Sequence, residues 1–254
     1  MSHSYGPSLS GRGAAALAAA LTLAGVPAVA HAQEQRAQPA PPPMPGLYVA
    51  SGATRYSTPG GAVRFVFDRT GRTALLQFEG DPEVHVLRAA QAAGGGLIYS
   101  SENANVMLRV TPQGSLTLYT RNLQTGAAAT AEGDTDRLTP EAIAFADMQE
   151  RFRRLQAQAR RRVGQTITFS VPANLPPAAA GVVLDAAERA AEGLAMAPMT
   201  NVRRVIITIG RTPAVALRGD QLFVQVAPQY GYAGRPSSGS IRNVVTGTVQ
   251  GPQQ

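Results

Sequence analysis

The sequence contains no cysteine, no lysine and no tryptophan among its 254 residues. Without cysteine, the chain can form no disulfide, no thiolate metal site and no cysteine-linked lipid anchor. Packing, hydrogen bonds and ion pairs must hold the folded part together. A chain of this length can bury one sizeable core or two smaller ones, so this is feasible.

Histidine is scarce as well, with three residues in the whole chain. Only His85 lies outside the first 32 residues, which argues against a histidine-containing catalytic triad or a two-histidine metal site. In the run "EVHVLR" the alternating pattern makes His85 a cross-strand partner. We expect no catalytic residue, no metal and no cofactor, and the sequence favours a non-enzymatic role.

The N-terminus has the organisation of a secretory signal peptide. A short polar segment with Arg12 precedes an alanine-rich apolar run, which closes on Ala30-His31-Ala32. Small residues at these positions predict cleavage before Gln33, with Ala28-Val29-Ala30 as an alternative site. Gly25 and Pro27 interrupt the run, and it is too short for a membrane span, which needs about 20 apolar residues. We therefore expect a signal peptide at residues 1–32, a periplasmic or secreted protein, and no transmembrane segment in the mature chain.

Residues 33–45, "QEQRAQPAPPPMP", predict a proline-rich linker, because proline favours an extended chain. An antiparallel β domain is predicted over residues 46–122. Phe65 and Phe67 alternate with Arg64 and Val66, a period of two that is typical of strands with one buried face. Seven such runs separated by turn residues predict a meander or a small barrel. The runs are "GLYVA", "AVRFVFD", "TALLQFE", "EVHVLR", "GLIYSS", "NVMLRVT" and "SLTLYT".

An α+β domain is predicted over residues 139–249, after a linker "GAAATAEGDTD" at residues 126–136. Thr139 as N-cap and Pro140 at the first helical position would begin a helix that ends at Gly164. Its apolar seam is Phe145, Met148, Phe152, Leu155 and Ala159. A strand, an alanine-rich helix, a strand and a hairpin turning at Gly219-Asp220 follow, giving the order α-β-α-β-β. The fold class is therefore α+β, and the tripeptide Arg218-Gly219-Asp220 is interpreted as a hairpin turn rather than an adhesion motif.

The end of the predicted helix carries Arg160, Arg161 and Arg162. Acids in the first half and arginines in the second match the helix dipole, so a solvated structural helix is one interpretation. The other is a surface that binds anionic envelope polymers or lipid head groups. Nucleic acid is not expected as a partner, since no aromatic residues interleave with these arginines.

Glu79, Asp81 and Glu83 cluster in "FEGDPEV". Two carboxylates in one cleft could hydrolyse glycan, if burial raised the pKa of one of them. They flank a Gly80-Asp81-Pro82 turn, however, so a solvated hairpin tip is expected.

Several segments resemble the family known as domain of unknown function 4908, uncharacterised exported proteins of alphaproteobacteria. The most specific are "FEGDPEVHVLR" and "GRPSS", residues 234–238. The resemblance implies export and a shared architecture, but no catalytic residue. Residues 166–190 are also similar to the first strand and helix of outer-membrane-protein-A-like peptidoglycan binders, whose aspartate and arginine motif has no counterpart here.

In the "GRPSS" loop, Arg235 is a candidate for holding an anion, with Ser237 and Ser238 as hydrogen-bond donors. The alternative is that Arg235 ties the loop to backbone carbonyls. Together these features predict a non-catalytic binding or structural protein of the cell envelope. A carboxylate-based envelope glycan hydrolase and a protein inhibitor or assembly partner of an envelope enzyme remain as alternatives, and an envelope protein is a candidate partner.

Overall fold

The computed structural model describes residues 52–173, 175–197 and 199–248. The predicted signal peptide, the proline-rich linker and the predicted strand at residues 46–50 lie outside these ranges. No helix within them is long and apolar enough to cross a membrane.

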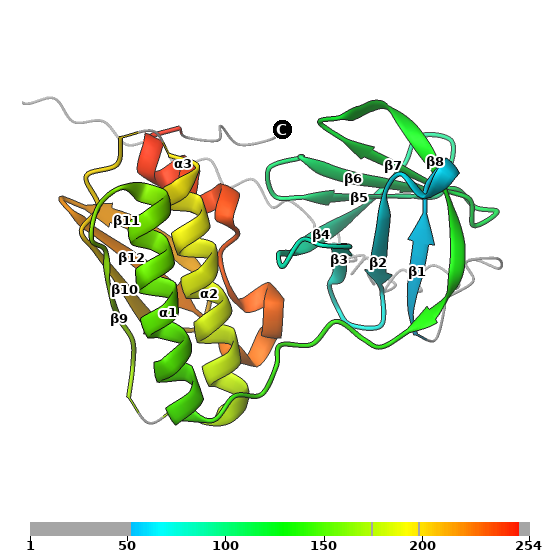
Figure 1. Ribbon diagram of the computed structural model, residues 1–254. Coiled ribbons are helices and arrows are strands. Elements are labelled where there is room, and N and C mark those ends of the chain that lie inside the picture. Colours follow the sequence, from blue (N-terminus) through cyan, green and yellow to red (C-terminus); the bar gives the residue numbers. More distant parts are fainter. Residues whose placement is uncertain (1–51, 174, 198, 249–254) are drawn as a thin grey trace, which may run out of the picture. The chain divides into compact units, whose positions relative to one another are not determined.

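Eight antiparallel strands form a closed barrel in which each strand pairs with the next and β8 pairs with β1 (Figure 1). This confirms the predicted small antiparallel barrel. The strands are β1 (Ala53–Ser57), β2 (Arg64–Asp68), β3 (Ala74–Phe78), β4 (Val84–Gln91), β5 (Leu97–Ser101), β6 (Val106–Val110), β7 (Leu116–Thr120) and β8 (Leu123–Thr135), with a short 3-10 helix η1 (Pro59–Gly61) after β1.

The barrel interior is filled by the side chains that the period-two pattern places inward. An eight-stranded barrel is narrow enough for side chains to fill it. Phe67 packs edge-on against Tyr99, with ring centroids 5.1 Å apart. The other buried residues of this core include Phe65, Leu76, Leu87, Leu108 and Leu118.

Strand β8 corrects the prediction of a linker at residues 126–136. This segment is rich in alanine and glycine and lacks apolar alternation, yet it pairs with β7 on one side and β1 on the other. Backbone hydrogen bonding, rather than side-chain pattern, makes it a strand. At Gly126, where φ is +81°, an added Cβ would lie 2.6 Å from the Tyr119 ring, so a small residue is required there. Strand β1 was not predicted either.

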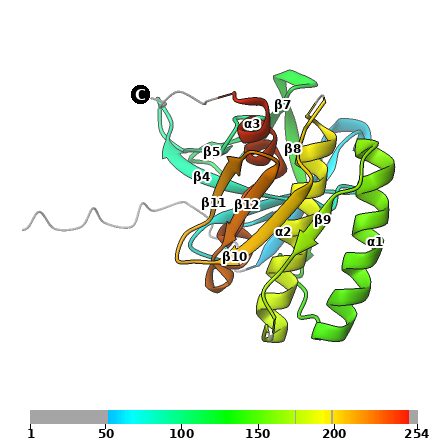
Figure 2. The ribbon, with the colours of Figure 1, turned by 90° about the vertical axis from the view of Figure 1, so that its left-hand side faces the viewer.

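The second part of the chain has one strand more than the predicted α-β-α-β-β order: the hairpin supplies two strands, so the order is α-β-α-β-β-β, followed by a third helix. Its sheet has the strand order β11-β12-β10-β9, with β10 parallel to both β9 and β12 (Figure 2). The hairpin of β11 and β12 turns at Gly219-Asp220, as predicted. The elements are α1 (Phe145–Val163), β9 (Thr168–Ser170), α2 (Pro177–Ala195), β10 (Arg204–Ile209), β11 (Ala214–Arg218), β12 (Gln221–Val226), the 3-10 helix η2 (Pro228–Gly234) and α3 (Ser238–Thr246).

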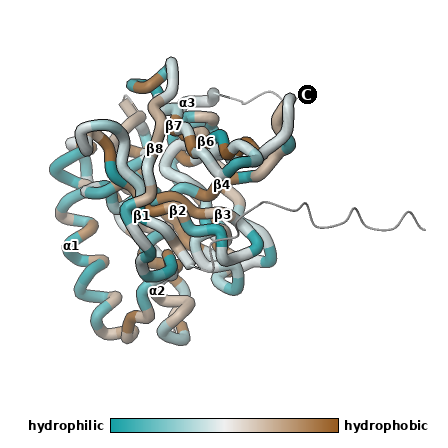
Figure 3. The backbone as a smooth tube through the Cα atoms, turned by 90° about the vertical axis from the view of Figure 1, so that its right-hand side faces the viewer, coloured by the Kyte–Doolittle hydropathy of each residue, from teal (hydrophilic) through white to brown (hydrophobic). Residues whose placement is uncertain are grey.

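Helices α1 and α2 cover one face of this sheet. Figure 3 shows α1 as a mainly hydrophilic tube with hydrophobic segments at intervals, as expected for a helix with one apolar face. Met148, Phe152, Leu155 and Ala159 of that face are buried in a core shared with α2 and the sheet. Helix α2 is apolar nearly all round and is buried over most of its length.

The predicted start of α1 at Thr139 is wrong, because the helix begins at Phe145 with Ala144 as N-cap. The preceding residues run alongside α2 instead, where the Ile143 N–H donates to the Pro177 carbonyl at 3.1 Å. Ile143 is buried in the core, which favours this extended path over an additional helical turn.

Because this segment lies so close to α2, we expect alanine at one helical glycine, Gly181, to destabilise the protein. A Cβ added at Gly181 would lie 1.8 Å from the Glu141 carbonyl oxygen. Although alanine gains about 1 kcal/mol in helix propensity over glycine, we expect Gly181→Ala to lower the free energy of unfolding by about 1–3 kcal/mol, because the backbone must move. Urea unfolding followed by circular dichroism measures this change.

The matched control is Gly52→Ala, where an added Cβ meets nothing within 4 Å. Its effect should stay within about 0.5 kcal/mol. A Gly181→Ala protein as stable as the parent would contradict the packing described here.

Candidate functional site

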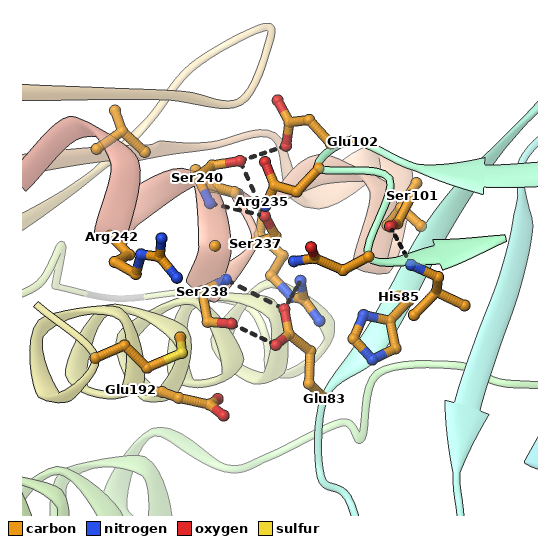
Figure 4. Close-up of a pocket in the computed structure, with 18 of the residues that line it drawn as sticks. Glu83, His85, Ser101, Glu102, Glu192, Arg235, Ser237, Ser238, Ser240 and Arg242 are labelled. Atoms are coloured by element: carbon orange, nitrogen blue, oxygen red, sulfur yellow. Dashed lines mark hydrogen bonds and ion pairs between the residues drawn. The ribbon is translucent and has the colours of Figure 1, made fainter. Parts of the chain in front are cut away.

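A cavity of about 550 Å³ is lined by residues of the barrel and of the α+β part of the chain. From the barrel come Glu83, the start of β4 and the turn after β5. From the α+β part come the C-terminal half of α2, the start of β11, and the GRPSS loop with α3. Figure 4 shows polar side chains from these elements converging on Glu83.

Glu83 occupies the centre of this arrangement, and it is only 5% exposed. The Asp81 carboxylate accepts the Glu83 N–H at 2.8 Å, which fixes the turn before β4. The Glu83 carboxylate accepts the Ser238 N–H at 3.1 Å and also the Ser238 hydroxyl. The prediction of a solvated hairpin tip is therefore wrong for Glu83, although Glu79 is exposed.

Two buried arginines compensate the Glu83 charge. Arg235 lies 4.0 Å from the Glu83 carboxylate, donates to Asp185 through Nε, and donates to the Val84 carbonyl at 3.0 Å. Arg189, from α2, also lies 4.0 Å from Glu83 and donates to Glu192 at 2.7 Å. These contacts join the hairpin before β4, helix α2 and the GRPSS loop into one ion-pair network, which we call the Glu83 network.

The network shifts the pKa values of its carboxyl groups in opposite directions. Burial opposes the charge of Glu83, but the Ser238 hydrogen bond and the nearby His85, Arg235 and Arg189 outweigh it, so its pKa is lowered. Burial raises the pKa values of Glu188 and Glu192, against the effect of Arg189. Glu83 is therefore held ionised, which suits an anchor and not a general acid.

His85 lines the same cavity as Glu83. It is a cross-strand partner of Leu76 on the neighbouring strand β3 and packs edge-on against Phe78. Burial lowers the pKa of His85, and its ion-pair contact is with Asp81 at 3.9 Å. Glu79 and Asp81 line a different hollow from the one that Glu83 lines. Within the described residues, no group of three or more metal-ligating side chains is found.

The three residues of the GRPSS loop that the sequence suggested for anion binding, Arg235, Ser237 and Ser238, line the cavity. The Arg235 and Ser238 donors are directed to internal carboxylates. Ser237 is the N-cap of α3, where its hydroxyl accepts the Ser240 N–H at 3.1 Å. Arg160, Arg161 and Arg162 lie exposed at the end of α1 and do not line the cavity.

The cavity lining also holds three arginines that no sequence pattern singled out. Arg88 and Arg121 are exposed and Arg242 is half-buried on α3. Arg121 donates to the neutral Asn105 at 3.0 Å. In the part of the chain that the structure describes, none of the three forms an ion pair. By contrast, each carboxylate of the lining has a protein donor: Glu83 and Glu192 as above, and Glu102 from Ser240.

Comparison with known proteins adds a family but no activity. The family model described as "Domain of unknown function (DUF4908)" matches residues 27–245, which confirms the resemblance seen in the sequence. No curated protein and no solved structure matches the chain.

Removing the Glu83 charge should destabilise the fold, because two buried guanidinium groups lose a counter-ion. We expect Glu83→Gln to lower the free energy of unfolding by roughly 3 kcal/mol, as is typical for breaking a buried ion pair. The exposed neighbour Glu79 is the control, and Glu79→Gln should change stability by less than about 0.5 kcal/mol. Equal effects of the two substitutions in urea unfolding would show that Glu83 is not a buried partner.

The parent protein and the Glu83→Gln variant also test whether folding lowers the pKa of Glu83. A carboxyl whose pKa is lowered by folding stabilises the folded state above its unfolded pKa of about 4.3, and this contribution disappears as the pH falls through the folded pKa. The stability difference between the parent and Glu83→Gln should therefore be constant near neutral pH and shrink below pH ~4.3. A difference that grows on acidification would mean that the pKa of Glu83 is raised.

Proposed function

This chain belongs to the DUF4908 family, and we propose that it is a non-catalytic binding protein of the cell envelope that holds a small anionic ligand in the cavity beside Glu83. The observation that carries the proposal is the charge distribution of the lining. Its carboxylates are engaged by protein donors, whereas Arg88, Arg121 and Arg242 have no carboxylate partner among the described residues. An anion entering the cavity would therefore meet guanidinium groups whose charge no carboxylate of the described residues neutralises.

The size and polarity of the cavity support this choice of ligand. About 550 Å³ lies within the range of small-molecule sites, roughly 300–1,000 Å³. Asn103, Asn105 and Asn122 add amide groups beside the arginines. A compact organic anion with further hydroxyl or carbonyl groups matches these donors and acceptors.

Arg242 is the residue on which binding should depend most. Half-burial lowers the local dielectric, and a charge-assisted hydrogen bond is stronger there than at the exposed Arg88 and Arg121. Figure 4 shows Arg242 reaching from α3 toward the loop that carries Ser238.

The geometry supports a binding role better than it supports the alternatives. Of Glu79, Asp81 and Glu83, only Glu83 lines this cavity, so the carboxylate pair expected of a glycan hydrolase is not formed here. Glu79 and Asp81 line a separate hollow, in which Glu79 is exposed. An inhibitor that docks through the barrel would have to use a loop as its contact, because the described barrel is closed by the pairing of β1 with β8 and leaves no strand edge. The export address rests on the pattern of residues 1–32.

The test is calorimetric titration of the purified protein with glucuronate, citrate, glucose 6-phosphate and inorganic phosphate. We expect at least one of these anions to bind, and Arg242→Gln to weaken it at least tenfold, because a hydrogen bond to a charged group contributes about 1.5–3 kcal/mol. The matched control is Arg109→Gln, an exposed arginine of β6 outside the cavity lining.

Two results would overturn the proposal. One is that none of the four anions binds the parent protein. The other is that Arg109→Gln weakens binding as much as Arg242→Gln does, since the effect would then reflect net charge and not this cavity.

A further inference from the structure

Arginines from three separate segments lie at one end of the α+β part of the chain, the end at which α1 and α2 finish. Figure 1 shows α1 and α2 running in the same direction, so both finish at the end of the sheet where β9 begins. Arg160, Arg161 and Arg162 form the last turn of α1, just before the Gly164 cap. Arg203 and Arg204 lie at the start of β10, and Arg218 lies at the end of β11.

Hydrogen bonds bring these segments together. Gln165, three residues after Arg162, donates to the Thr200 and Val202 carbonyls at 2.9 Å each. The Arg203 carbonyl accepts the Thr168 N–H at 3.0 Å, and the Arg203 N–H donates to the Asp220 carbonyl at 2.8 Å. Both Arg204 and Arg218 have Gln221 as their register partner. We call this surface the basic end, and its arginines are Arg160, Arg161, Arg162, Arg203, Arg204 and Arg218.

The charge of the basic end is not neutralised within the described residues. All six arginines are exposed, and none of them forms an ion pair. Arg218 lies over the Phe223 ring, with 5.3 Å between its guanidinium carbon and the ring centroid. Asp220, at the hairpin turn, is an exposed acid beside these arginines, and Glu192, on which Arg162 acts electrostatically, is already held by Arg189. Six positive charges around one exposed acid form a surface complementary to an anionic one.

An apolar side chain on the same edge indicates what kind of anion this surface meets. Met199 lies in the connection between α2 and β10 and is 97% exposed. Arginines beside a projecting apolar side chain are typical of surfaces that rest on a bilayer, where the charges meet head groups and the apolar group enters the acyl boundary. A polysaccharide offers charge but no apolar layer for Met199.

We propose that the basic end docks the protein on anionic phospholipid head groups of a membrane surface, with Met199 entering the lipid. This inference is independent of the ligand proposed for the cavity. Each arginine near an anionic bilayer contributes roughly a fivefold gain in partition coefficient, so the surface suffices for reversible docking at low salt.

The experiment is flotation of the purified protein with vesicles of pure phosphatidylglycerol and of pure phosphatidylcholine, at low and high salt. We expect binding to phosphatidylglycerol only, weakened by salt because the contacts are exposed. The triple variant Arg160→Gln, Arg161→Gln, Arg162→Gln should bind at least tenfold more weakly, and Arg203→Gln with Arg204→Gln should weaken binding as well. Met199→Ser should weaken vesicle binding severalfold.

The matched control removes the same charge from exposed positions on the barrel, as Arg55→Gln, Arg72→Gln and Arg109→Gln. It should keep vesicle binding within about twofold of the parent, since these arginines lie outside the basic end. Equal loss in the barrel control would overturn the proposal, because binding would then follow net charge. A second result would also overturn it: dextran sulfate binds as tightly as the vesicles do, and Met199→Ser changes neither affinity. The surface would then be assigned to anionic polymers.

Discussion

The buried charge of Glu83 is the constraint on which the candidate site depends. An ionised carboxylate out of water is costly unless it is paired and hydrogen-bonded. Here the pairing comes from residues far away in the sequence, namely Arg189 on α2 and Arg235 and Ser238 around the GRPSS loop. The hairpin before β4 is therefore tied to two segments of the α+β part of the chain.

The network contains more carboxylates than guanidinium groups. Glu83, Asp185, Glu188 and Glu192 surround Arg189 and Arg235. This excess explains why the pKa values of Glu188 and Glu192 are raised while that of Glu83 is lowered: burial dominates for the first two, and the donors converge on the third. The donors of Arg235 and Ser238 are directed to these internal carboxylates, so the proposed ligand would be recognised by other residues, such as Arg242.

The two proposed binding surfaces use arginine in different surroundings. In the cavity, half-buried Arg242 lies among amides and hydroxyls that can discriminate between small ligands. At the basic end, the arginines and Met199 are exposed, which suits an extended partner. Arg160, Arg161 and Arg162 match the helix dipole whether or not they bind a partner. Their proposed role in docking depends on the neighbouring arginines of β10 and β11.

Period two and period 3.6 in the sequence predicted much of the fold, because burial of one face imposes them. They predicted the barrel strands from β2 to β7 and, one strand short, the α-β-α-β-β order of the second part. They could not predict β8, whose alanines and glycines carry no apolar alternation and whose pairing partners are distant in sequence. Arg235, Ser237 and Ser238, which the sequence suggested as anion-binding candidates, line the cavity, and so do Arg88, Arg121 and Arg242, which no sequence pattern indicated.

The burial of Glu83 was missed for a related reason. A glutamate beside a Gly-Asp-Pro turn is usually solvated, and its partners lie more than a hundred residues away. A signal for the network was present in α2, however. A helix that is apolar nearly all round is buried, so Asp185 and Arg189 within it required charged partners.

The most direct test of the account is a double-mutant cycle between Glu83→Gln and Arg235→Gln, measured by urea unfolding. If the two charges compensate one another in the folded protein, the double variant should be more stable than the sum of the single effects predicts, by roughly 2 kcal/mol. Additivity within about 0.5 kcal/mol would contradict the account, because the two residues would then act independently.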